Sequence, residues 1–220
     1  MLRNILKIAF RVFWKEKGYS FLNVLGLAVG ISASLLLFLY IEDEYSVNKF
    51  HKDHERIYQV MEHQIYSGNN IFSTPANPGP LMDAFKAEMP EIEYMIQLSW
   101  NEEKLFILED KTFKETGRMV SSDFFKMFSF PFIEGSSEGS LEAPDIGYLS
   151  ETLAKKMYGE EPALGQTFEV NGWGQFKVGG VFEDVPSNST LQFDFILPNQ
   201  KWWEDNSWLE DWGNNGMRHF

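Results

Sequence analysis

The 220-residue chain contains no cysteine and too few basic residues to balance its acidic ones. Without cysteine there is no disulfide framework, no thiolate-bound zinc or iron–sulfur site and no thiol nucleophile. The 19 lysine and arginine residues stand against 32 aspartate and glutamate residues, so the net charge is −13. Phosphate contacts need a basic surface. We therefore expect no nucleic acid among the partners.

The charge is unevenly distributed along the chain. Residues 1–20 contain five basic residues and one acidic residue, whereas residues 42–220 carry a net charge of −17. Between these segments, the 21 residues 21–41 have no charged side chain. About 20 apolar residues in a helix span the hydrocarbon core of a bilayer. The sequence predicts a transmembrane helix and the start of a stalk over residues 18–44.

A cleavable signal peptide is the alternative interpretation of this apolar stretch. Its apolar region would have about 7–15 residues and would end in small residues. Here the run is longer and is followed by Glu42, Asp43 and Glu44, which favours an uncleaved anchor. The basic excess before the span places the N-terminus inside. We expect a protein of the cytoplasmic (inner) membrane whose residues after about 42 are periplasmic or extracellular.

Residues 1–17 predict a separate amphipathic elbow helix on the cytoplasmic side. A basic residue recurs at every fourth position and forms one stripe: Arg3, Lys7, Arg11 and Lys15. Apolar residues lie largely away from this stripe, which suits a helix in the membrane interface with lipid as its partner. A solvated basic tail that only sets topology is the alternative. Gly18 would permit a turn into the span.

Within the predicted span, Gly26 and Gly30 form a GxxxG pattern, and Ser34 follows one turn later. Small residues on one helix face allow another helix to approach closely. We interpret these three residues as a transmembrane packing face. The alternative, that the small residues are incidental, stays open.

Residues 45–220 show the mixed patterns of an α+β domain. Strands are expected over 56–66 and 191–197, in a meander over 93–120, and in a hairpin across 172–174. Helices are expected over 81–89, 123–128 and 151–158, the last capped by Ser150 and stopped by Gly159. The predicted fold class is therefore α+β: an interfacial helix and one transmembrane helix, followed by a mixed α/β extracytoplasmic domain.

Three possible catalytic or binding motifs fail on their context. The G-x-S-x-G match at 135–139 lies in polar sequence without the flanking strand and helix of a nucleophile elbow. The glycine-containing stretch 159–167 lacks the phosphate-binding lysine. His51 and His54 have no obvious third ligand, so we interpret them as a juxtamembrane surface pair. We predict no enzyme activity, and no metal or cofactor in this chain.

An ordered set of motifs nevertheless resembles a known family. The set comprises residues 6–37, the acidic exit 43–46 with Phe50 and His51, RIYQV at 56–60, the proline-bounded helix region 74–93, DFF at 123–125 with MFSFP at 127–131, LSE at 149–151 with AKK at 154–156, and VGGVFEDVP at 178–186. It resembles the N-terminal half of an ABC-transporter permease with a MacB-like periplasmic core domain, in the FtsX-like superfamily.

The resemblance implies a non-catalytic membrane subunit. Such permeases pair with a separate cytoplasmic ABC ATPase, which binds the ATP, and with a second permease copy. ATP-driven motion passes through the first span to the external domain for efflux, lipoprotein export or hydrolase activation. The alternative is a single-span sensor or adaptor with a ligand-binding external domain.

Family members also continue into further spans. The resemblance therefore implies that residues 45–220 are a truncated MacB-like periplasmic core domain. Five large apolar residues close together near the C-terminus fit this expectation, because they would form an exposed patch for later sequence to cover. They are Trp202, Trp203, Trp208, Leu209 and Trp212.

Overall fold

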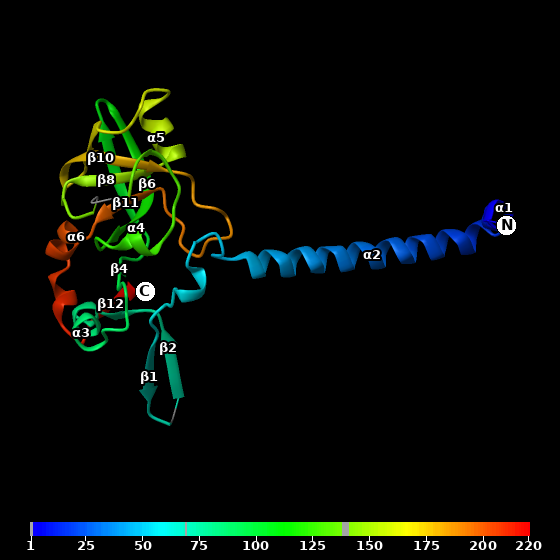
Figure 1. Ribbon diagram of the computed structural model, residues 1–220, viewed down its shortest axis with the longest axis horizontal. Helices are drawn as coiled ribbons and strands as arrows, with labels where there is room; N and C mark the ends of the chain where they lie inside the picture. Colours follow the sequence, from blue (N-terminus) through cyan, green and yellow to red (C-terminus); the bar gives the residue numbers. More distant parts are fainter. Residues whose placement is uncertain (1, 69, 138–140) are drawn as a thin grey trace. The chain divides into compact units, whose positions relative to one another are not determined.

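The computed structural model describes residues 2–68, 70–137 and 141–220 (Figure 1). The chain divides into two compact units, Met1–Val47 and Asn48–Phe220. The first unit is helical and the second is a mixed α/β domain, as the sequence predicts.

The first unit consists of α1 (Leu2–Lys15) and α2 (Lys17–Ser46). α2 is long and apolar enough to cross a membrane, and none of its residues is buried in protein. A helix that is apolar on all sides is stable where lipid or other helices surround it. The expected turn at Gly18 is wrong: the backbone leaves the helical region at Glu16 (φ −106°, ψ 55°), and Gly18 lies inside α2.

Six strands of the second unit form a closed ring, in which each strand pairs with the next. In ring order they are β5 (Glu102–Leu108), β6 (Lys111–Val120), β11 (Phe195–Pro198), β8 (Ile146–Ser150), β10 (Gly174–Phe182) and β9 (Thr167–Val170). The β6–β11 and β8–β10 pairs are parallel, and the other four are antiparallel. A closed ring leaves no free edge for unwanted pairing.

The remaining strands extend this ring. β4 (Gln97–Leu98) pairs with the end of β6 that extends past β5. β12 (Asn215–His219) pairs with β4, and β3 (Asn77–Pro78) pairs with β12. β7 (Phe132–Gly135) pairs with the end of β10. β1 (Glu62–Tyr66) and β2 (Asn70–Thr74) form a separate two-stranded ribbon.

The described part of the second unit also contains short helices. η1 (His54–Arg56) precedes β1, and α3 (Leu81–Glu88), α4 (Phe124–Met127), α5 (Glu151–Tyr158), α6 (Gln200–Asp205) and η2 (Ser207–Glu210) lie between strands. α5 confirms its sequence signals, because the Ser150 side chain accepts a hydrogen bond from Leu153 N and Gly159 ends the helix at φ 69°. The hairpin across 172–174 is likewise confirmed by β9 and β10.

Two predicted strands are shorter than expected. In 56–66 only Glu62–Tyr66 is a strand, because residues 57–61 have no ladder partner and make one main-chain hydrogen bond to the sheet, from Val60 N to His219 O (3.0 Å). In 191–197 the strand begins only at Phe195. The sequence reading missed β2, β7 and β12.

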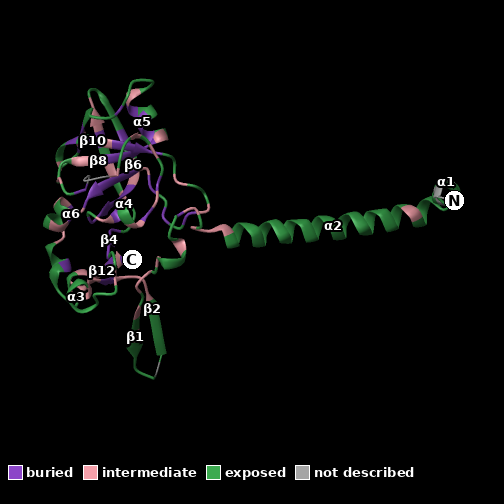
Figure 2. Ribbon diagram, in the orientation of Figure 1, coloured by how far each residue is buried: buried purple, intermediate pink, exposed green. Residues whose placement is uncertain are grey.

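Two apolar clusters occupy the two faces of the ring. The pairs Phe106↔Val170 and Phe176↔Phe168 belong to one cluster, to which all six ring strands contribute, so this cluster fills the interior. α5 adds Leu153 to it. The second cluster packs the phenylalanines around α4 against the outer face of β8 and β11. Figure 2 shows the buried residues concentrated on these strands.

The C-terminal tryptophans do not all form the expected exposed patch. Trp202 and Leu209 are buried and belong to the interior cluster. Trp203 packs against the same cluster and is partly buried. Only Trp208 and Trp212 are exposed. The expectation is therefore wrong for most of this group, because α6 and η2 turn its apolar side toward the domain.

Enlarging Gly147 tests the closed ring. A Cβ at this position would lie 2.7 Å from Phe168 Cζ and 2.8 Å from Leu197 Cδ2. We expect Gly147→Val to cost about 1–3 kcal/mol through overpacking and to lower the Tm by roughly 2–4 °C per kcal/mol, measured by thermal unfolding in detergent. Gly213→Ala is the control, because its Cβ meets nothing closer than 3.7 Å. Equal Tm values for the two variants would contradict this interior.

Candidate functional site: the connecting segment and its cavity

The second unit begins with residues 48–60, here called the connecting segment, and Asn48 fixes its start. Asn48 adopts φ 60°, a left-handed conformation that asparagine tolerates better than most residues. Its N–H donates to Asn188 O (3.0 Å) and its side-chain amide donates to Thr190 Oγ1 (3.0 Å). Asn48 Oδ1 accepts from Thr190 N (2.9 Å). These bonds attach the start of the segment to the loop before β11.

His51 anchors the middle of the segment inside the outer apolar cluster. It is 2% exposed, and its ring lies 4.0 Å from that of Phe50, 4.9 Å from Phe128 and 5.2 Å from Phe130, measured between centroids. Burial lowers the pKa of His51 to about 4. The interpretation of His51 and His54 as a surface pair is therefore wrong for His51. No three potential metal ligands gather among the residues that the structure describes.

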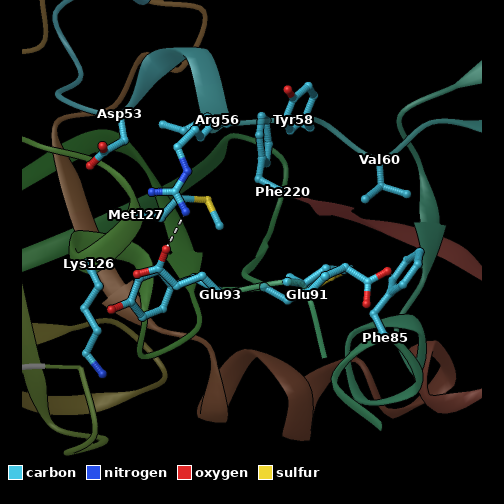
Figure 3. A pocket seen from close by; sticks show the side chains of 14 residues that line it. Asp53, Arg56, Tyr58, Val60, Phe85, Glu91, Glu93, Lys126, Met127 and Phe220 are labelled. Atoms are coloured by element: carbon cyan, nitrogen blue, oxygen red, sulfur yellow. Dashed lines mark hydrogen bonds and ion pairs between the residues drawn. The ribbon is translucent and has the colours of Figure 1, made fainter. Parts of the chain in front are cut away.

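The end of the segment lines a cavity of about 540 Å³. Asp53, Arg56 and Tyr58 form one side of it, and Glu91–Met95, Lys126, Met127, Phe85 and Phe220 supply the rest (Figure 3). Arg56 Nη2 bonds Glu93 Oε2 at 2.6 Å across this cavity. Both side chains are more than half exposed, so the pair adds little stability. The lining mixes aromatic groups with charges of both signs, which suits an amphipathic ligand or partner segment.

The connecting segment is thus bonded to the domain along its whole length. Lys52 N donates to Ser129 Oγ (3.3 Å), between the Asn48 contacts and the Val60 bond to β12. The segment is therefore held to the domain at its start, middle and end. It follows α2 in the chain, with Val47 between them.

The predicted packing face is present on α2. Gly26, Gly30 and Ser34 line one shallow groove together with Leu27 and Ile31. A Cβ at either glycine would meet nothing within 4 Å. Ser34 Oγ donates to Gly30 O (2.9 Å), which satisfies the hydroxyl within the helix. A role for this face in helix association stays a prediction.

The structure also locates the basic stripe and two of the rejected motifs. Lys7, Arg11 and Lys15 are exposed on α1, while the side chain of Arg3 lies outside the described ones. Of the G-x-S-x-G match at 135–139, the last two residues fall outside the described range. Gly159 ends α5 and opens the loop to β9, so the stretch 159–167 is a helix stop and connection.

The sequence did not predict that Asn48 and Thr190 are joined by hydrogen bonds. They are separated by 142 positions, and no local pattern links two such polar residues. One signal was available: asparagine just after a long helix is a common way to end it in the left-handed conformation. That signal places the turn at Asn48 but does not identify its partner.

Comparison with known proteins points to one family. Residues 20–215 match the family model described as MacB-like periplasmic core domain. A solved domain of a permease protein from Porphyromonas gingivalis is similar at 26% identity and a TM-score of 0.60, over 73% of this chain and 72% of that one. No protein with a curated description matches significantly.

Two further solved structures are similar at lower scores. The extracellular domain of the noncanonic ABC-type transporter YknZ from Gram-positive bacteria has 13% identity and a TM-score of 0.48, over 66% of this chain and 72% of that one. The periplasmic region of MacB from Actinobacillus actinomycetemcomitans has 15% identity and a TM-score of 0.47, over 66% of this chain and 64% of that one.

The buried histidine predicts a loss of stability in acid. An unfolded histidine takes up a proton below about pH 6.5, whereas folded His51 stays neutral until about pH 4. Protons therefore favour the unfolded state as the pH falls from 6.5 to 4, by about 1.4 kcal/mol per pKa unit. His219 behaves in the same way, since burial also lowers its pKa to about 4.

We expect His51→Phe to remove a large part of this acid sensitivity, measured as Tm against pH between 4 and 7. Exposed His63 provides the control, and His63→Gln should leave the profile unchanged. A His51→Phe profile with the slope of the unaltered chain would mean that His51 is not buried as a neutral ring.

Proposed function

We propose that this chain, which belongs to the MacB-like periplasmic core domain family, acts in the permease of an ABC transporter. In this role it carries ATP-driven motion to an extracytoplasmic domain. A MacB-like domain after a single N-terminal apolar helix fits an inner-membrane protein. In this proposal residues 1–17 are the cytoplasmic elbow, 18–44 the span with the stalk start, and 45–220 the external domain.

The connecting segment supports this role. A motion of α2 must pass through residues 48–60, and their bonds to Thr190, to Ser129 and to β12 distribute it over separate parts of the domain. The closed ring makes the domain resist internal shear, since sliding one ring strand breaks its bonds to both neighbours. Efflux, lipoprotein export and hydrolase activation can all use such a motion.

The partners follow from the same proposal. A cytoplasmic ABC ATPase would supply the ATP, and a second permease copy would pair with this one. Gly26, Gly30 and Ser34 offer a face on α2 where another span can approach closely. The exposed basic residues of α1 suit contact with anionic lipid. A single-span sensor remains the competing function, and it would use the 540 Å³ cavity as its ligand site.

The proposed topology can be tested by labelling, because the chain has no native cysteine. Ser67→Cys lies in the exposed turn between β1 and β2, and Lys15→Cys lies on exposed α1. We expect a membrane-impermeant maleimide to label the first variant in intact spheroplasts and the second only after permeabilisation, since the basic flank stays inside. The opposite labelling order would exclude the topology.

The proposed coupling can be tested with one spin label at the exposed Lys111→Cys on β6, which in a pair of permease copies reports the distance between their external domains. With the partner ATPase present, we expect ATP to change the distance distribution measured by electron paramagnetic resonance. Asn48→Ala removes the side-chain bonds to Thr190 and should reduce this change while ATP hydrolysis continues.

The same measurement separates the two candidate functions. A distance that responds to ATP only when the ATPase is bound supports the permease. A distance that never responds to ATP, but responds to a small ligand without the ATPase, supports the sensor and contradicts the permease role.

A further inference from the structure

Two arginines from different strands lie on one face of the sheet beside Trp100. Leu98 pairs with Val120 of β6 and with Arg218 of β12, so these three side chains share a face. Arg118 is two residues before Val120 on β6, so it belongs to the same face. The register shifts by one residue between Leu98↔Val120 and Glu102↔Gly117, and Trp100 lies in this irregularity next to Ser99.

Arg118 is a buried cation with unused hydrogen-bonding capacity. It is 4% exposed, and its Nη1 donates to the main-chain oxygen of Ser99 at 2.7 Å. Its Nε is buried and has no hydrogen-bond partner among the described residues. A guanidinium has five donors in a planar fork, and among these residues one neutral acceptor, the Ser99 oxygen, is bonded to it.

Arg218 is held in place beside this group by neutral and aromatic neighbours. Its guanidinium carbon lies 5.5 Å from the ring centre of Trp100 and 5.4 Å from that of Phe220. With its amide oxygen turned toward Arg218, Gln59 accepts from Nη2 (2.8 Å) and Nε (3.1 Å). These contacts orient the cation without neutralising it.

The described part of the domain supplies no counter-ion to either arginine. Its ion pairs all involve other cations, although residues 42–220 carry an excess of 17 negative charges. A buried charge without an opposite charge is costly. Burial is the main cause that lowers the pKa of Arg118 to about 10, and the charge of Arg218 adds to it. Arg118 is therefore charged at neutral pH, and its repulsion by Arg218 shows that the two guanidinium groups are near each other.

We propose that Arg118 and Arg218, with Trp100 beside Arg218, form a binding site for a small oxyanion, a carboxylate or a phosphate. Planar guanidinium forks match the spaced oxygens of such anions and bind them through charge-assisted pairs. The anion would supply the missing counter-charge and an acceptor for the unused donors of Arg118. The half-exposed side of Trp100, which is 43% exposed, leaves the site open to solvent.

The test is titration calorimetry of the full chain in detergent, with inorganic phosphate in one arm and acetate in the other, at constant ionic strength set with chloride. We expect saturable binding of one anion per chain. Arg218→Gln and Arg118→Met should each weaken it about tenfold or more, because each removes a charged fork. Arg56→Gln is the matched control: Arg56 is exposed and paired with Glu93, and its loss should leave binding unchanged.

The arms also identify the anion class. Binding of phosphate but not acetate assigns the site to phosphate, binding of acetate but not phosphate assigns it to carboxylates, and comparable binding of both shows a site that accepts either oxyanion. Tryptophan fluorescence of the unaltered chain and of Arg218→Gln gives a second readout that does not depend on the fold of Arg118→Met, since an anion beside Trp100 should alter its emission only in the unaltered chain. No saturable binding in either arm, or equal affinity in Arg218→Gln, would overturn the proposal.

Discussion

The hydrogen bonds that join β6 to β11 turn an open sheet into a ring, and the positions of the core and of the connecting segment follow from this closure. The pairing is parallel and joins 117–120 to 195–198. It brings the two strands so close at Gly117 that an added Cβ would lie 2.4 Å from Phe195 O. Glycine is therefore required where the ring closes, and Phe195 can point inward toward Phe106 (4.8 Å between centroids).

The connecting segment uses this ring as its support. The loop before β11 carries Asn188 and Thr190, which bind Asn48. The outer face of β11 and β8 carries the aromatic cluster in which His51 is buried. β12, which extends the sheet from β4, receives the bond from Val60. The closed sheet therefore fixes both the place and the stiffness of the segment that follows α2.

Local sequence patterns predicted much of this domain, but they did not predict pairings between residues far apart in the sequence. α5 was predictable because Ser150 and Gly159 mark the two ends of an eight-residue helix. The ring was not, since the β6–β11 pair that closes it joins strands about 80 positions apart and no short pattern encodes that register. His51 was interpreted as a surface residue because the sequence shows no third metal ligand for it, and only the phenylalanines folded around it reveal its burial. The Arg118–Arg218 face likewise depends on β4 lying between two strands distant in sequence.

The β1–β2 ribbon has a consequence for how the folded chain responds to proteases. Ile65, Tyr66, Ile71 and Phe72 are all exposed on it, yet no lysine or arginine occurs between Arg56 and Lys86. Trypsin therefore finds no bond to cut there, however often the ribbon opens. An intact tryptic fragment covering this stretch therefore reflects its lack of lysine and arginine. It does not show that the stretch is rigid. Chymotrypsin, which cuts after aromatic residues, is the enzyme whose cleavage rate reflects the motion of this ribbon.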